Sequence, residues 1–208
     1  MVVRAPVLLS AAVEGLVDEA VLRRLIADEG ASLAYTHGKN GKAVIRRDLN
    51  GYNQAAYHSP WVVLIDLDHD EDCAPPVRAR WLPNPAPHIR FRIAVRQVEA
   101  WLLADRERIA KFLSVSQSQV PPQPETLPNP KETLVNLARG SRRRAISEDM
   151  VPRPESGRPV GPAYASRLME FASTPTLWRP DVAADHADSL RRCRERIREL
   201  IEHSEETP

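Results

Sequence analysis

The run from Trp61 to Ile65 constrains the fold more strongly than any other segment of this chain. Its five residues, Trp-Val-Val-Leu-Ile, are all apolar and rich in β-branched side chains, and Asp66 follows them directly. Successive side chains of a strand point to opposite faces of a sheet, so a strand that is apolar at every position must be covered on both faces. Helices cover both faces of a parallel sheet in this way. The run therefore predicts a buried parallel strand in an α/β fold.

Other strand-like and helix-like patterns alternate along the first half of the chain. We expect further strands over 7–13, 32–35 and 88–95, and helices over 17–26, 43–57, 77–81 and 97–113. Strands that alternate with helices indicate a largely parallel sheet with right-handed crossovers. The sequence thus predicts an α/β core, residues 1–113, in which a parallel sheet of about four strands lies between helices.

The second half of the chain has a different pattern. Five prolines between 121 and 130 break the chain into a loop. Helical periodicity then returns over 131–139, 162–172 and 181–202. We therefore expect residues 114–208 to form a mainly helical C-terminal extension that packs on the core.

Composition excludes several classes of protein. No run approaches the roughly 20 apolar residues that a bilayer span needs, and the N-terminus does not resemble a signal peptide, so we expect a cytoplasmic protein without membrane contact. Cys73 and Cys193 are far apart, which argues against a disulfide framework. His69 and Cys73 have a zinc-like spacing, but no second pair completes a tetrahedral site.

Charge is unevenly distributed although the net charge is only +1. Acidic residues gather between 66 and 72, and arginines gather over 78–96, 139–144 and 191–198. A polyanionic substrate that approaches an acidic metal pocket with basic rims would fit this distribution. The alternative for each arginine run is an ordinary solvated helix face.

Three carboxylates stand where strands are expected to end. Glu14 follows the first strand, and Asp66 and Asp68 follow the strand from Trp61. Ligands of parallel α/β sheets bind beyond the carboxyl ends of the strands, so the three groups would meet if the two strands are neighbours. In extended backbone both aspartates would face the pocket while Leu67 turns to the core. A hard divalent cation, Mg²⁺ or Mn²⁺, relieves the repulsion of such a cluster. Each acid alone could instead cap a helix or a turn.

The segments around these acids resemble two motifs of the TOPRIM superfamily, which includes topoisomerases, bacterial primases and OLD-type nucleases. Val13-Glu14-Gly15 before a helix is similar to the first motif, and Asp66-Leu67-Asp68 after a strand is similar to the second. The resemblance covers roughly residues 7–105. It implies a four-stranded parallel sheet between helices and metal-dependent cutting or joining of phosphodiester bonds, with Glu14, Asp66 and Asp68 as catalytic metal ligands.

A narrower resemblance involves three later segments. Residues 98–105, 129–131 and 161–164 resemble an uncharacterised group of small bacterial TOPRIM-like proteins related to OLD nucleases. That resemblance implies a mobile-element or phage-defence context and an ATPase as partner protein. It also favours Lys131 as a catalytic cation and Arg158 as a substrate-binding one.

Several other residues are candidates for the same site. Asp70 and Glu99 could add metal ligands, although Glu99 could also be an acid favoured by a helix dipole. Lys39 and Lys42, on a glycine-rich loop, could bind the substrate, with ordinary solvent-exposed cations as the alternative. Asp105 is expected to be a surface or capping acid.

These observations lead to a hypothesis with two rivals. We expect a Mg²⁺- or Mn²⁺-dependent nuclease that acts on DNA or RNA, in which the cation activates water for in-line attack on phosphorus. The first rival is a haloacid-dehalogenase-like phosphatase, in which Asp66 would be phosphorylated and Asp68 would be the acid. The second is a non-catalytic TOPRIM-like module that binds or regulates an ATPase.

Overall fold

The structure is a computed structural model that describes residues 6–69 and 71–206. The chain forms two compact units. The first comprises the residues up to Ala94 together with those from Arg192 onward, and the second comprises Val95–Arg191. The expected packing of residues 114–208 on the core stays a prediction.

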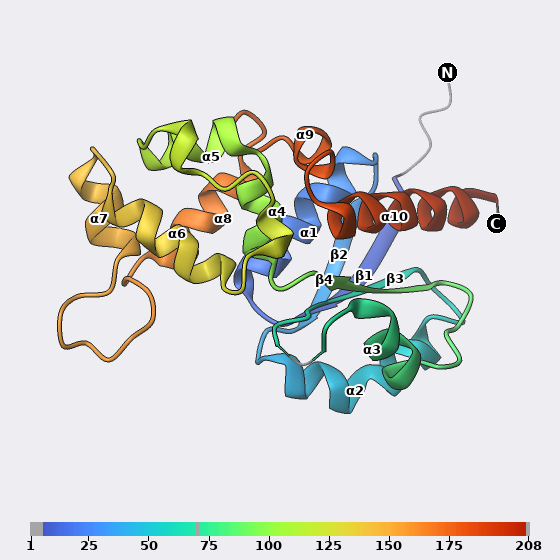
Figure 1. Ribbon diagram of the computed structural model, residues 1–208. Helices are drawn as coiled ribbons and strands as arrows, with labels where there is room; N and C mark the ends of the chain where they lie inside the picture. Colours follow the sequence, from blue (N-terminus) through green and yellow to red (C-terminus); the bar gives the residue numbers. More distant parts are fainter. Residues whose placement is uncertain (1–5, 70, 207–208) are drawn as a thin grey trace, which may run out of the picture. The chain divides into compact units, whose positions relative to one another are not determined.

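The first unit is a parallel sheet covered by helices, which confirms the predicted α/β class. It contains β1 (Leu8–Val13), α1 (Leu16–Asp28), β2 (Ser32–Gly38), α2 (Lys42–Ala55), β3 (Trp61–Asp66), α3 (Ala74–Trp81), β4 (Ile89–Ala94) and most of α10 (Asp188–Glu206). The four strands pair in the order β2-β1-β3-β4, and every pair is parallel. Figure 1 shows α2 and α3 on one face of the sheet and α10 on the other.

Burial in the sheet follows the alternation of its side chains. All six residues of β3 are buried, as expected for a central strand between two helical layers. Val63 and Ile65 pack with Ile45 of α2 and Val77 of α3 on one face. Arg90 and Arg92 of β4 alternate with the buried Ile89, Phe91 and Ile93, so this outer strand is less apolar than β3.

The second unit is helical. Residues 95–191, all of which are described, form helices and loops without a strand. They include α4 (Val98–Ala104), α5 (Arg106–Leu113), α6 (Pro130–Arg139), α7 (Arg144–Met150), α8 (Tyr164–Ser173), α9 (Pro180–Ala184), the short 3₁₀ turns η1 (Gln117–Gln119) and η2 (Pro124–Thr126), and the start of α10. Every residue of α4 is buried, including Glu99.

The structure corrects the sequence prediction in four places. The helix expected over 97–113 is divided at Asp105, which ends α4 and caps α5 by accepting a hydrogen bond from the Arg108 amide. The helix expected over 181–202 is likewise divided into α9 and α10, and β2 extends to Gly38. Helix α7 was not expected. Among the described residues no helix is long and apolar enough to cross a bilayer.

Candidate active site

Glu14 and Asp66 meet at the carboxyl ends of two neighbouring strands. Glu14 follows β1, and Asp66 is the last residue of β3. Val13 is in register with Leu64, two residues before Asp66. The Glu14 carboxylate accepts a hydrogen bond from the backbone N–H of Asp66, with Oε1 2.8 Å from the nitrogen. The first and second acidic motifs, which are 52 residues apart, are therefore in direct contact.

The loop after β2 is attached to the end of β1. The N–H of Lys39 donates to Val13 O at 2.8 Å, and the N–H of Gly41 donates to Glu14 O at 3.1 Å. Gly38 has a φ of +85°, and a Cβ there would lie 2.4 Å from Val13 O. Only glycine fits such an approach without a shift of the backbone. The glycine-rich loop thus fixes the backbone that carries Glu14.

Asp68 binds Lys42. The Lys42 Nζ, from the first residue of α2, lies 2.6 Å from Asp68 Oδ2. Leu67 is buried in the core as expected, but Asp68 has a φ of +52°, so the backbone does not continue as extended strand. Aspartate tolerates this left-handed conformation better than most residues. The orientation of Asp68 therefore comes from a turn and an ion pair rather than from strand alternation.

Lys39 lies beside α1. Its Nζ is 3.1 Å from Glu19 Oε2, and its backbone also has a positive φ of 65°. Burial opposes ionisation of Glu19, but interactions with Lys39, Arg23 and the Thr36 hydroxyl outweigh it and lower the pKa of the Glu19 carboxyl. Lys39 is thus paired with an acid of the first helix, and its expected role in substrate binding stays a prediction.

Asp18 is an acid at this edge that the sequence analysis did not single out. It lies in the first turn of α1 and is nearly completely buried. Its Oδ2 is 3.2 Å from the position that a Cβ on Gly15 would occupy. An acid in the first turn of a helix is favoured by the helix dipole, so the sequence alone gives no reason to assign Asp18 another role. Its burial next to Gly15 is what marks it as a further candidate.

A second polar cluster lies within the helical unit. Glu99, 3% exposed, accepts a hydrogen bond from the Tyr164 hydroxyl at 3.3 Å, and Lys131 Nζ lies 3.5 Å from Glu99 Oε1. The Lys131 amide also donates to Gln97 Oε1 at 3.2 Å. The three segments that carry the narrower resemblance therefore meet at one buried carboxylate. A buried carboxylate needs such partners, because an unpaired charge in the interior is costly.

Two candidates have little structural support. Arg158 is exposed in the loop between α7 and α8, where its amide donates to Ser156 Oγ at 3.4 Å. Asp70 lies outside the described residues. Their expected roles, substrate binding for Arg158 and metal binding for Asp70, stay predictions.

The donor set at the sheet edge has the chemistry that Mg²⁺ or Mn²⁺ requires. Glu14, Asp66 and Asp68 offer carboxylate oxygens, which hard cations prefer. Within residues 6–69 and 71–206, however, no three His, Cys, Asp or Glu side chains are arranged so that they could hold an ion. Because Asp68 binds the Lys42 ammonium, its carboxylate would have to leave that ion pair to join the other two. The ligand types thus fit a hard divalent cation, whereas the described side chains are not arranged as a metal site.

Comparisons with known proteins do not assign this arrangement to a family. The site consists of a carboxylate, Glu14, that accepts a hydrogen bond from the Asp66 amide across neighbouring strand ends, and of Asp68, which is paired to a lysine. No known protein family, curated protein or solved structure matches the chain.

Proposed function

We propose that this chain is a Mg²⁺- or Mn²⁺-dependent nuclease of the TOPRIM type, which hydrolyses phosphodiester bonds. The observation that supports the proposal most directly is the 2.8 Å hydrogen bond from the Asp66 amide to the Glu14 carboxylate. It joins the two acidic motifs at the sheet edge where parallel α/β proteins bind their ligands. The phosphatase alternative gives Glu14 no role, so this contact favours the nuclease.

The residues at the carboxylate edge of the sheet would have different roles in the reaction. Glu14, Asp66 and Asp68 would hold the cation, which would neutralise phosphate charge and activate water. The hydrogen bond from Asp66 fixes the direction of the Glu14 carboxylate before any substrate arrives. Lys42, which now pairs with Asp68, would bind a phosphate oxygen and stabilise the negative charge that develops there.

The test is cleavage of labelled single-stranded DNA, duplex DNA and RNA by the full chain with Mg²⁺ or Mn²⁺. We expect Asp66→Asn and Asp68→Asn to lower the rate by at least about 100-fold, a loss typical of removing one electrostatic stabiliser from a catalytic site. Asp48→Asn is the matched control, because Asp48 pairs with Arg47 on α2 and the substitution makes the same change of charge. Wild-type cleavage by Asp66→Asn would refute the proposed site.

One observation favours a second candidate, a non-catalytic binding module. The ion pair between Lys42 and Asp68 neutralises that carboxylate without a metal ion. Thermal unfolding distinguishes the two functions, because a ligand that binds only the folded state raises stability by about 2.7 kcal/mol at 100 times its Kd. We expect Mn²⁺ to raise the Tm of the wild type and not that of Asp66→Asn. A wild-type Tm that does not respond to Mn²⁺, together with absent cleavage, would support the binding module.

A further inference from the structure

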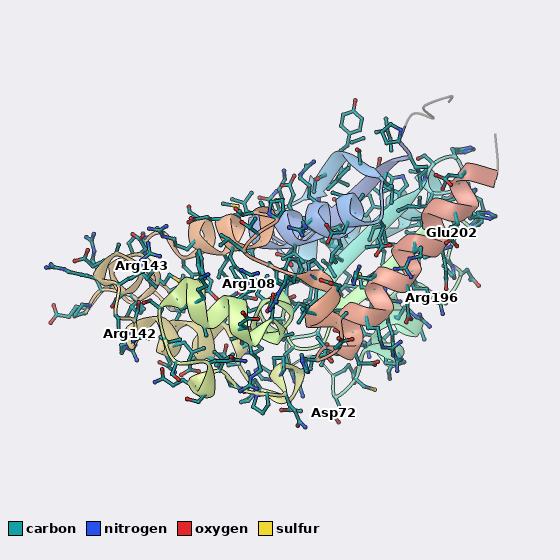
Figure 2. The ribbon with its side chains drawn as sticks, turned by 90° about the horizontal axis from the view of Figure 1, so that it is seen from above. Asp72, Arg108, Arg142, Arg143, Arg196 and Glu202 are labelled. Atoms are coloured by element: carbon teal, nitrogen blue, oxygen red, sulfur yellow. The ribbon has the colours of Figure 1, made fainter. Side chains whose placement is uncertain are left out.

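Two of the arginine runs seen in the sequence meet in a cleft of the first unit. The cleft has a volume of about 350 Å³ and lies along β4, with α3 on one side and α10 on the other. Four of its lining residues are arginines: Arg78 from α3, Arg90 and Arg92 from β4, and Arg196 from α10. We call this site the arginine cleft. Arg196 is labelled on α10 in Figure 2.

The charge of the arginine cleft is poorly compensated. Among the described residues, none of those lining it is acidic. Arg196 pairs with Glu199 at 2.6 Å, but Arg78 forms no ion pair within the described part of the chain. Within residues 6–69 and 71–206, Arg90 donates to the backbone oxygens of Pro87 and Ile89 and to no carboxylate. At least three guanidinium groups therefore share the cleft without a carboxylate bound to them.

Arg92 is the most constrained of the four. Its Nε is buried and has no hydrogen-bond partner among the described residues, and its side chain lies against the thiol of Cys193. Burial lowers the pKa of Arg92, the Cys193 thiol opposes this change, and the charges of Arg78 and Arg196 add to it. An arginine stays protonated at all ordinary pH values, so it cannot relieve this cost by losing its proton. A bound anion would relieve the mutual repulsion of the guanidinium groups.

The position of the arginine cleft relates it to the candidate active site. Arg92 is in register with Leu64, and Asp66 is in register with Ala94. Paired residues of parallel strands point to the same face, and so do residues two apart, so Arg92 and Asp66 lie on one face of the sheet. Arg92 and Asp66 are on neighbouring strands and are offset by two residues along them, so their Cα atoms are about 8 Å apart. The row of arginines thus leads toward the carboxylate edge.

We propose that the arginine cleft binds the phosphodiester backbone of a nucleic-acid strand. Guanidinium groups match phosphate oxygens in two-point hydrogen bonds, and several of them in a row match a ligand whose charge repeats. Each strand of a duplex carries a charge about every 3.4 Å of helix axis, so a strand in the cleft would reach the carboxylate edge within a few nucleotides. That the bound strand is the substrate of the enzyme rests on the proposed function. That the cleft binds such a strand does not.

The test measures binding of a fluorescent single-stranded oligonucleotide to the full chain in EDTA, where no metal-dependent cleavage occurs. We expect Arg78→Ala and Arg196→Ala each to weaken binding by about tenfold and to reduce the slope of log affinity against log salt by about 0.7. Arg198→Ala is the matched control, because Arg198 is on the same helix but pairs with Glu29 outside the cleft. We expect this variant to bind as the wild type does.

The outcomes separate this proposal from the proposed function. Loss of binding in the two cleft variants supports the cleft even if the wild type cleaves nothing. Equal affinities of the wild type, both cleft variants and the control would overturn it, even if the chain proves to be a nuclease. Tripolyphosphate serves as the second probe. If it binds in a manner that depends on Arg78 while the oligonucleotide does not bind, the ligand is a free polyphosphate and the assignment to a nucleic-acid backbone is overturned.

Discussion

Alanine at Gly38 should destabilise the protein more than alanine at Gly41, although both glycines have nearly the same backbone conformation. Their φ angles are +85° and +87°. A side chain in this region costs about 1 to 2 kcal/mol. At Gly41 nothing lies within 4 Å of the added Cβ, whereas at Gly38 the Cβ would lie 2.4 Å from Val13 O and 2.5 Å from Ile45 Cδ1. Ile45 can rotate, but the Val13 carbonyl is backbone and must shift.

The contact with Val13 adds a second cost to Gly38→Ala. Forcing an atom into a packed site costs about 1 to 3 kcal/mol. We therefore expect Gly38→Ala to lower the free energy of unfolding by about 2 to 5 kcal/mol and Gly41→Ala by about 1 to 2 kcal/mol. Urea denaturation of both variants measures the difference, provided that the m values are unchanged. Equal losses would show that the contact with Val13 is not the cause.

The same pair of variants tests how the loop supports the site. Val13 directly precedes Glu14, so a shift of its carbonyl moves the carboxylate that binds the Asp66 amide. Among fully folded molecules at low temperature, we expect metal-dependent cleavage to fall in Gly38→Ala and to be nearly retained in Gly41→Ala. Displacements of about 1 Å in a catalytic site can cost about 100-fold in rate.

Three further predictions concern single ionisable groups. Asp105 is fully buried and binds Arg179 at 2.6 Å. Asp105→Ala should therefore lower the free energy of unfolding, measured by urea denaturation, by about 3 to 5 kcal/mol. A loss below about 1 kcal/mol would contradict this account. Burial raises the pKa of the Cys193 thiol to about 11. The free energy of unfolding should therefore fall by about 2 kcal/mol between pH 9 and pH 11, because the thiol ionises more readily in the unfolded chain than in the folded one, and a Cys193→Ala variant should lack this fall. Because the pKa of Glu19 is lower in the folded state than in the unfolded state, its ionisation stabilises the fold above the unfolded pKa, and this stabilisation is lost on acidification. Lys39→Ala should raise the pKa of Glu19 in an NMR titration and weaken the acid dependence of stability. An unchanged pKa would exclude the ion pair as the cause of the lowered value.

The elements that the sequence predicted well are those with a single strong pattern. Trp61 to Asp66 is buried at every position, as its apolar run indicated, and the contact between Glu14 and Asp66 follows from the rule that parallel strands end at one edge. The break at Asp105 could not be predicted from periodicity, because the helices on both sides of it are apolar toward the core. At the break, Asp105 caps α5 and also pairs with Arg179, a partner that is distant in the sequence.

The surroundings of the acids were less predictable than the acids themselves. The pair between Lys42 and Asp68 joins residues 26 apart and depends on the left-handed turn at Asp68. Neither feature has a local pattern in the sequence. The arginine runs were visible, but only the fold shows that two of them share a cleft. The arginines of the third run, 139–144, are exposed, and Figure 2 shows Arg142 and Arg143 at the surface of the protein.

The order of the units along the chain affects how the protein is made. The first unit is interrupted after Ala94 and resumes only at Arg192. Its last segment carries Cys193, Ile197 and Leu200, which are completely buried. A ribosome therefore releases all four strands and α1 to α3 long before it supplies most of α10, the last helix of the first unit. The first unit must stay incomplete while the intervening helical unit is synthesised, so a nascent chain that stops before residue 192 would expose the apolar surface that Cys193, Ile197 and Leu200 cover, and chaperones could bind it.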